Sequence, residues 1–184
     1  MLYGNFMEVE QNIIMMQEDI STGLRAFVHW AYTGVFGTCF TKRVNANGKE
    51  EHGDAIVASL WILADKLGAS KFGNDAFMEL FEISGQEDFY IDPSTIEYVY
   101  TNTLPSAKLR TVVKDLVVAY GPFSEEREAS DELKKKWLDL LAKGGDFVVD
   151  VTQSGELHAY EGIDIPVDHK DQLKYIEVNK LSAH

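Results

Sequence analysis

Residues 50–54 bring together the side chains best suited to bind a cation. Glu50, Glu51 and Asp54 offer carboxylate oxygens, and His52 offers an imidazole nitrogen. Such groups are usual protein ligands of divalent metal ions. We interpret them as a solvated loop that leads into the cap of a helix, because charged residues are mostly exposed and acidic ones favour helix starts. The sequence thus predicts no metal and no cofactor.

The residues elsewhere that can act as a nucleophile or a base lie in surroundings that indicate packing. Cys39, the only cysteine, lies between Phe36 and Phe40, and a reactive thiol needs a lowered pKa that nothing in the sequence indicates. His29 lies in an amphipathic helical pattern, where we interpret it as a packed or surface histidine. The chain also lacks the phosphate-binding pattern GxxxxGKS/T, a GxGxxG after a strand, and the GxSxG nucleophile elbow. We therefore predict that it is not an enzyme.

Composition and charge exclude several classes of protein. The 184 residues are 45% hydrophobic and 26% charged, the balance of a globular chain of one domain plus an appendage. Seventeen basic and 30 acidic residues give a formal net charge of −13, which disfavours binding to nucleic acid or to anionic membranes. The sequence shows no secretory signal and no apolar run of the roughly 20 residues that a membrane span needs. It predicts an intracellular protein of the cytoplasm or nucleus that contacts neither nucleic acid nor membrane.

Apolar periodicity and capping residues predict a mostly helical chain. Helices are expected over residues 19–34, 54–68, 70–81, 92–100, 105–120 and 130–144, with Ser70, Asp92 followed by Pro93, and Ser130 as starts and Gly34, Gly68 and Gly144 as ends. In the first of these helices the apolar residues at helical spacing are Leu24, Phe27, Val28 and Ala31. The short apolar run at residues 12–16 predicts a buried strand, and residues 35–53 are expected to form a loop. Residues 147–151 and 157–160 are expected to pair as a hairpin.

Two segments carry a pattern more specific than periodicity. One runs from Leu24 to Gly34 and reads LRAFVHWAYTG; the other runs from Leu60 to Ala69, reads LWILADKLGA and is followed by FGNDA at residues 72–76. Together they resemble the fungal form of the BTB/POZ domain, over residues 6 to about 120. The resemblance implies an α+β, mostly α fold: a BTB/POZ-like helical cluster with a short strand, followed by a helical extension.

The same resemblance implies a division of the chain into three parts. Residues 1–102 form a partial BTB/POZ-like domain, residues 103–145 form the helical extension, and residues 146–184 form an acidic tail with the expected hairpin. The tail holds three basic and eight acidic residues.

Members of that family associate with other proteins, commonly as dimers, and many bind a cullin scaffold as ubiquitin-ligase adaptors. A hydrophobic-x-Glu motif helps to seat the cullin there, and Phe6-Met7-Glu8 matches it. The resemblance therefore implies a non-enzymatic interaction module with Phe6, Glu8, Trp30 and Tyr32 as partner-binding residues. The implied partner is a cullin scaffold or another BTB chain, with no small-molecule substrate. The alternative is a BTB-type structural or transcription-associated binding protein with no cullin link.

The chain also departs from the family at its start. Family members place a strand hairpin and two helices ahead of the Phe-x-Glu position, whereas Phe6 here is almost the first residue. The resemblance thus implies that the N-terminal part of the domain, which supplies much of the family's dimer interface, is missing. An incomplete gene model and a degenerate paralogue both account for this.

Overall fold

The computed structural model describes residues 20–37, 43–44, 50–51, 53–85, 89–120, 130–153 and 172–176. The helices of this part are α2 (Ile20–Thr33), α3 (Gly53–Leu67), α4 (Ser70–Ser84), α5 (Pro93–Asn102), α6 (Lys108–Tyr120), α7 (Asp131–Lys143) and α8 (Asp146–Gln153). Two short strands, β1 (Arg43–Val44) and β2 (Glu50–Glu51), pair antiparallel within the segment that the sequence analysis expected to be a loop. The prediction of a mostly helical chain is confirmed. The strand expected at residues 12–16 lies outside the described residues.

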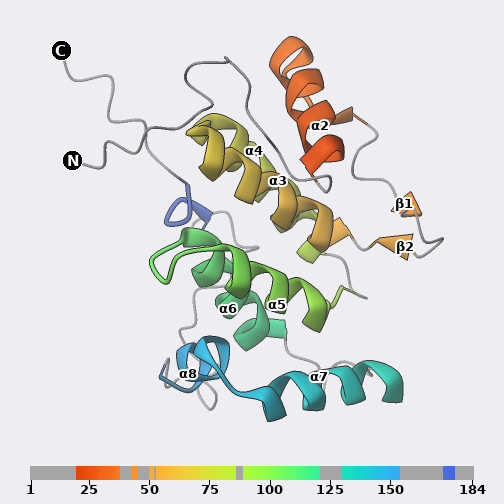
Figure 1. The fold of residues 1–184 in the computed structure, drawn as a ribbon, viewed down its shortest axis with the longest axis vertical. Helices are drawn as coiled ribbons and strands as arrows, with labels where there is room; N and C mark the ends of the chain where they lie inside the picture. Colours follow the sequence, from red (N-terminus) through yellow and green to blue (C-terminus); the bar gives the residue numbers. More distant parts are fainter. Residues whose placement is uncertain are drawn as a thin grey trace, which may run out of the picture.

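The described helices are arranged around the pair formed by α3 and α4. These two helices make the most extensive contact of the structure, with α2 packed on α3 at one end and α5 on its other side (Figure 1). Helices α7 and α8 lie at the far end, against α5 and α6. None of the helices in the described ranges is long and apolar enough to span a membrane.

Helix α3 is buried on several sides, as its broad apolar stripe predicts. Nine of its residues are buried, from Asp54 to Ala64. Its contact with α4 is close because Gly73 has no side chain, and a Cβ there would lie 3.2 Å from the Cβ of Ala64. Aromatic rings continue this core along α4, with Trp61 and Phe77 centred 5.5 Å apart.

Capping residues set several of the helix boundaries. Asp92 caps α5, since its carboxylate accepts from the backbone N–H of Ser94 at 2.8 Å, and Pro93 follows at the first helical position. Ser130 caps α7 in the same way through the N–H of Leu133. Both predicted starts are confirmed. The predicted Ser70 cap is wrong: Ser70 is the first helical residue of α4, and the capping position is Ala69, which makes no side-chain cap.

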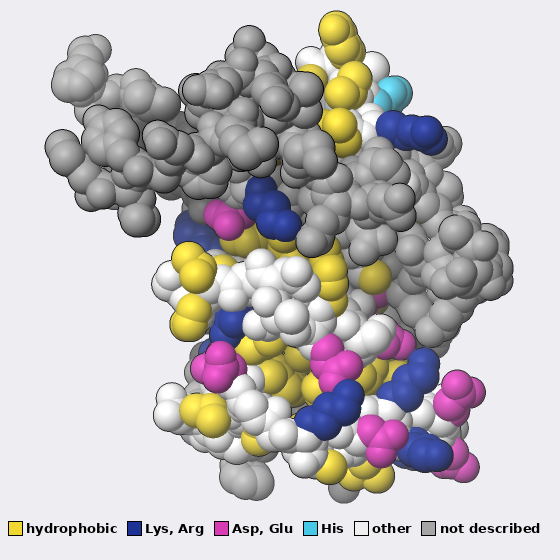
Figure 2. Space-filling view, viewed as in Figure 1, with side chains coloured by type: hydrophobic (Ala, Val, Ile, Leu, Met, Phe, Trp, Pro, Cys, Tyr) yellow, Lys and Arg dark blue, Asp and Glu magenta, His cyan; other side chains and the backbone are white. Residues whose placement is uncertain are grey.

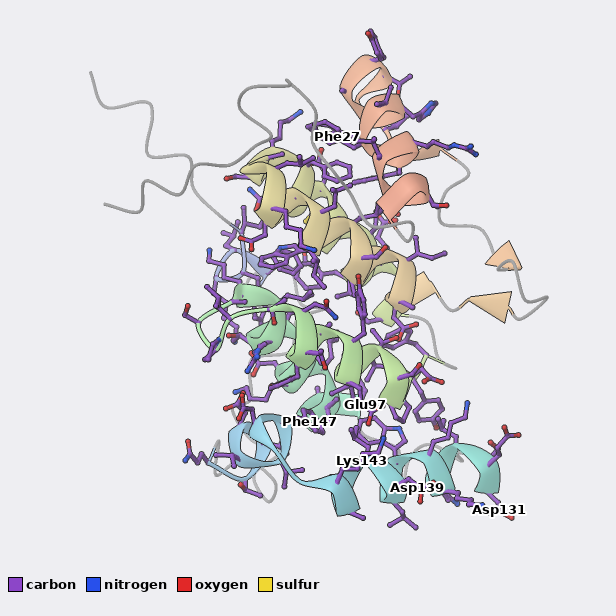
Figure 3. The ribbon with its side chains drawn as sticks, viewed as in Figure 1. Phe27, Glu97, Asp131, Asp139, Lys143 and Phe147 are labelled. Carbon is purple, nitrogen blue, oxygen red and sulfur yellow. The ribbon has the colours of Figure 1, made fainter. Side chains whose placement is uncertain are left out.

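The hairpin strand expected at residues 147–151 is wrong, because this segment forms α8. Phe147 and Val151, one helical turn apart, are both buried, whereas Val149 is exposed between them. The ring of Phe147 lies edge-on to Tyr100 at 5.4 Å, and Figure 3 shows its side chain at α8. Burial at positions i and i+4, after the Gly144–Gly145 break, stabilises a helix rather than an alternating strand. Residues 157–160 lie outside the described residues.

Candidate protein-binding surface

Helix α2 has apolar residues on two sides, and only one of these sides faces the core. Ala26 is buried, and Phe27 and Trp30 are half-buried against the core. Leu24 and Val28 are exposed. The apolar set expected from the sequence is therefore divided, because Leu24, Val28 and Ala31 lie on the solvent side and Phe27 on the core side.

Aromatic contacts with α4 fix the inward side of α2. The rings of Phe27 and Trp30 each lie 5.1 Å from the ring of Phe72, which is fully buried. The indole N–H of Trp30 donates to the Asp75 carboxylate at 2.8 Å, and the ammonium of Lys71 lies 5.4 Å from the centre of the indole. These contacts hold the helix in one rotational setting on α4, which decides which of its residues face solvent.

The outward side of α2 presents a continuous apolar stripe. Leu24, Val28 and Tyr32 follow one another at four-residue spacing and are 39%, 47% and 88% exposed, and Val35 extends the line at 57%. Gly34, with φ of +75°, ends the helix, and the N–H of Val35 donates to the hydroxyl of Thr33 at 3.3 Å. We call these four residues the α2 stripe.

The charge around the α2 stripe differs from that of the chain as a whole. Residues 20–37 contain no acidic residue and one arginine, Arg25, in a chain of net charge −13. Figure 2 shows hydrophobic side chains running along α2 at the top of the view, with a histidine and a basic side chain beside them. An exposed apolar line without like-charge repulsion is typical of a protein-binding surface.

The four predicted partner-binding residues have different positions. Tyr32 lies on the α2 stripe, whereas Trp30 lies in the contact between α2 and α4. Phe6 and Glu8 lie outside the described residues. Sequence reasoning did not select Leu24, Val28 and Val35, because an apolar residue in an amphipathic helix is ordinarily assigned to the core. The signal available was that α2 has more apolar residues than one buried face can hold.

A polar pocket lies between α5 and α7. It has a volume of about 270 Å³ and is lined by Asp92, Pro93, Ser94, Glu97, Lys136, Asp139, Leu140 and Lys143. Lys136 pairs with Asp92 at 3.4 Å, and Lys143 pairs with Glu97, two side chains that meet between the helices in Figure 3. These pairs involve four of the five charged residues that line the pocket, and the fifth, Asp139, belongs to neither pair.

No site for a metal emerges from the described ranges. They contain no group of three or more His, Cys, Asp or Glu side chains that could hold an ion. Asp54, one of the four residues considered for cation binding, is 2% exposed, and its carboxylate accepts from the backbone N–H of Asp92 at 2.9 Å. That carboxylate thus joins the start of α3 to the start of α5. The other three side chains, those of Glu50, Glu51 and His52, are not among those described.

The Asp92 cap predicts a dependence of stability on acid pH. Burial raises the pKa of Asp92, but hydrogen bonds from Ser94 and the charge of Lys136 outweigh it and bring the pKa below the ordinary 3.8. A carboxyl whose pKa falls on folding stabilises the fold above its unfolded pKa, and this contribution is lost as pH falls through the folded value. Asp92→Asn keeps a capping oxygen and removes the charge. We expect the variant to be about 0.5–1 kcal/mol less stable than the parent at pH 6, and this difference to be smaller at pH 3.

Urea unfolding at the two pH values measures this difference. Asp65→Asn, which alters an exposed carboxylate on α3, is the matched control and should track the parent at both. A constant gap between the parent and Asp92→Asn from pH 6 to pH 3 would show that the charge of Asp92 does not stabilise the fold.

No protein-family model, curated protein or solved structure matches this chain. Its function is therefore inferred from its surfaces and from the resemblance of its sequence segments.

Proposed function

We propose that this chain is a non-enzymatic protein–protein interaction module of the BTB/POZ type, and that its partner docks on the α2 stripe. The observation that carries the proposal is the exposure of Leu24, Val28, Tyr32 and Val35 along one side of a helix whose other side is fixed by aromatic packing. Exposure of a line of apolar side chains to water is unfavourable in free energy, and a partner that covers them removes this cost.

The resemblance to the BTB/POZ family supports a cullin scaffold as the partner. In this reading the chain is a ubiquitin-ligase adaptor, with Phe6 and Glu8 acting together with Tyr32. The alternative is a structural or transcription-associated binding protein that uses the same stripe with no cullin link. In either case the absence of acidic residues from α2, with Arg25 beside the stripe, favours a partner helix with an apolar face and acidic flanks.

Replacing Val28 by aspartate is expected to weaken binding to the N-terminal region of a fungal cullin by about 30-fold or more, because the charge would be buried at the centre of the contact. Titration calorimetry with the full chain measures the affinity. Lys135→Ala, on exposed α7, is the control and should bind as the parent does. Thermal unfolding of each variant establishes that the fold is intact.

A Phe6→Ala, Glu8→Ala double variant distinguishes the two readings of function. Loss of cullin binding in both this variant and Val28→Asp would support the adaptor. Binding that survives both changes would show that Phe6, Glu8 and Val28 do not contribute to it. Absence of cullin binding by the folded parent chain would reject the adaptor reading and favour the alternative without a cullin.

A further inference from the structure

Residues 172–176, here called the C-terminal strap, dock onto α4 and α6 far from their neighbours in sequence. Tyr175 is 1% exposed, with its ring 5.7 Å from that of Phe81 on α4. Its hydroxyl donates to the Asp115 carboxylate on α6 at 2.6 Å. Tyr175 is thus deeply inserted, with the polar end of its side chain against a buried acid.

The strap contacts α4 and α6 through Phe81, Lys108 and Asp115, and we call the surface formed by these three residues the groove. Phe81 forms an apolar wall, Asp115 places a carboxylate at the base of the slot, and the ammonium of Lys108 donates to the main-chain carbonyl of Ile176 at 2.7 Å. A ring slot with an acceptor at its base selects tyrosine over phenylalanine. The contact with a carbonyl oxygen holds the backbone of the bound segment whatever its side chain.

The two oxygens of the Asp115 carboxylate have different partners, one within α6 and the other on the strap. Oδ1 pairs with Lys114 at 2.8 Å, on the same helix. Oδ2 takes the Tyr175 hydroxyl and the ammonium of Lys174 at 3.1 Å, both from the strap. In the described structure, removal of the strap would leave one oxygen of a 5%-exposed carboxylate without these donors. The groove is therefore built to attract a lysine–tyrosine pair.

Tyr175 belongs to the hydrophobic core, whereas the residues before it in the strap are mostly at the surface. Leu173 is 72% exposed, Lys174 is exposed, and only Gln172 and Tyr175 are buried. Residues 154–171 separate the strap from α8, so it is tethered to the groove through a long connection. A short tethered segment that inserts a tyrosine next to an exposed lysine resembles a peptide ligand bound within its own chain.

We propose that the groove between α4 and α6 is a second recognition site, for short peptides in which lysine directly precedes tyrosine, and that the C-terminal strap is its occupant in cis. A peptide of this chemistry from another chain binds when the strap leaves. The tether makes the strap a competitor at high effective concentration, so the site is closed to weak external ligands. This site is distinct from the α2 stripe.

The test uses the full chain with Tyr175→Ala, which empties the slot, and a fluorescent peptide of residues 170–178. We expect the variant to bind this peptide at least about 30-fold more tightly than the parent chain, whose strap competes. A peptide with alanine in place of the tyrosine is the matched control and should not bind. Adding Asp115→Asn to the Tyr175→Ala chain should weaken peptide binding by about tenfold.

A second variant covers the case in which Tyr175→Ala does not fold. Tyr175→Phe keeps the ring and removes the hydroxyl, so it should give peptide affinity between those of the parent and the alanine variant. The proposal would be overturned if the folded alanine variant did not bind the peptide, or bound it no more tightly than the parent does. It would also be overturned if the phenylalanine variant behaved as the parent while a Phe-containing peptide bound as well as the Tyr peptide.

Discussion

Replacing Arg110 by methionine is expected to destabilise the folded chain by about 3–5 kcal/mol, because the change leaves several partly buried oxygen acceptors without their donor, at about 1–3 kcal/mol each. Arg110 is 5% exposed on α6. One of its nitrogens donates to the carbonyls of Tyr100 and Thr103, each at 2.7 Å, where α5 ends. A helix end has carbonyls without intrahelical partners, and here the guanidinium satisfies them.

The other contacts of Arg110 are with an aromatic ring, a hydroxyl and an exposed carboxylate. Its guanidinium lies 4.6 Å from the centre of the Tyr100 ring, and its Nε donates to the Thr103 hydroxyl at 3.1 Å. The ion pair with Asp146 contributes less, because the Asp146 side chain is 70% exposed and solvent screens it. Lysine cannot reproduce the planar fork of donors, so Arg110→Lys should also lose about 2 kcal/mol or more.

Urea unfolding followed by circular dichroism measures these losses. Lys135→Met removes an exposed cation from α7 and should change stability by less than about 0.5 kcal/mol. Asp146→Asn should cost less than about 1 kcal/mol. If Asp146→Asn proved as harmful as Arg110→Met, the ion pair rather than the carbonyl contacts would hold α6, α5 and α8 together.

The extent to which sequence predicted this fold follows from the range of each interaction. Caps act over three residues, so Asp92 and Ser130 were identified correctly. The state of residues 147–151 was wrong because Val148, Val149 and Val151 favour strands locally, whereas the burial of Phe147 against α5 and α7 stabilises a helix. Local propensity lost to tertiary packing in that segment.

The candidate surfaces were harder to predict than the helices for the same reason. The sequence marks α2 as apolar, but contacts with α4, among them those with Phe72 and Asp75, turn Trp30 inward and leave Tyr32 outward. The contact of Tyr175 with Asp115 joins residues 60 positions apart, and no sequence pattern around either residue predicts it. Pairings of this kind depend on how α4 and α6 come together, which periodicity in a single segment does not encode.

Replacing Phe72 by alanine is expected to have the other large effect, a loss of about 3–5 kcal/mol in the free energy of unfolding. The side chain of Phe72 is fully buried, and its ring lies 5.1 Å from each of Phe27, Trp30 and Phe36. The substitution removes the ring that these three aromatic side chains share as a contact. It would leave a cavity where α2 meets α4. Because Phe27 and Trp30 of α2 both pack on Phe72, the α2 stripe should also lose part of its fixed orientation.

Two readouts separate loss of stability from loss of the binding surface. Urea unfolding gives the stability, and calorimetry with the cullin fragment gives the affinity at a temperature where Phe72→Ala is still folded. Tyr32→Ala is the matched control: with its side chain 88% exposed, it should leave stability within about 0.5 kcal/mol of the parent. If α2 presents the partner surface, Phe72→Ala weakens both quantities and Tyr32→Ala weakens affinity alone. An unchanged unfolding midpoint for Phe72→Ala would contradict the packing on which the α2 stripe depends.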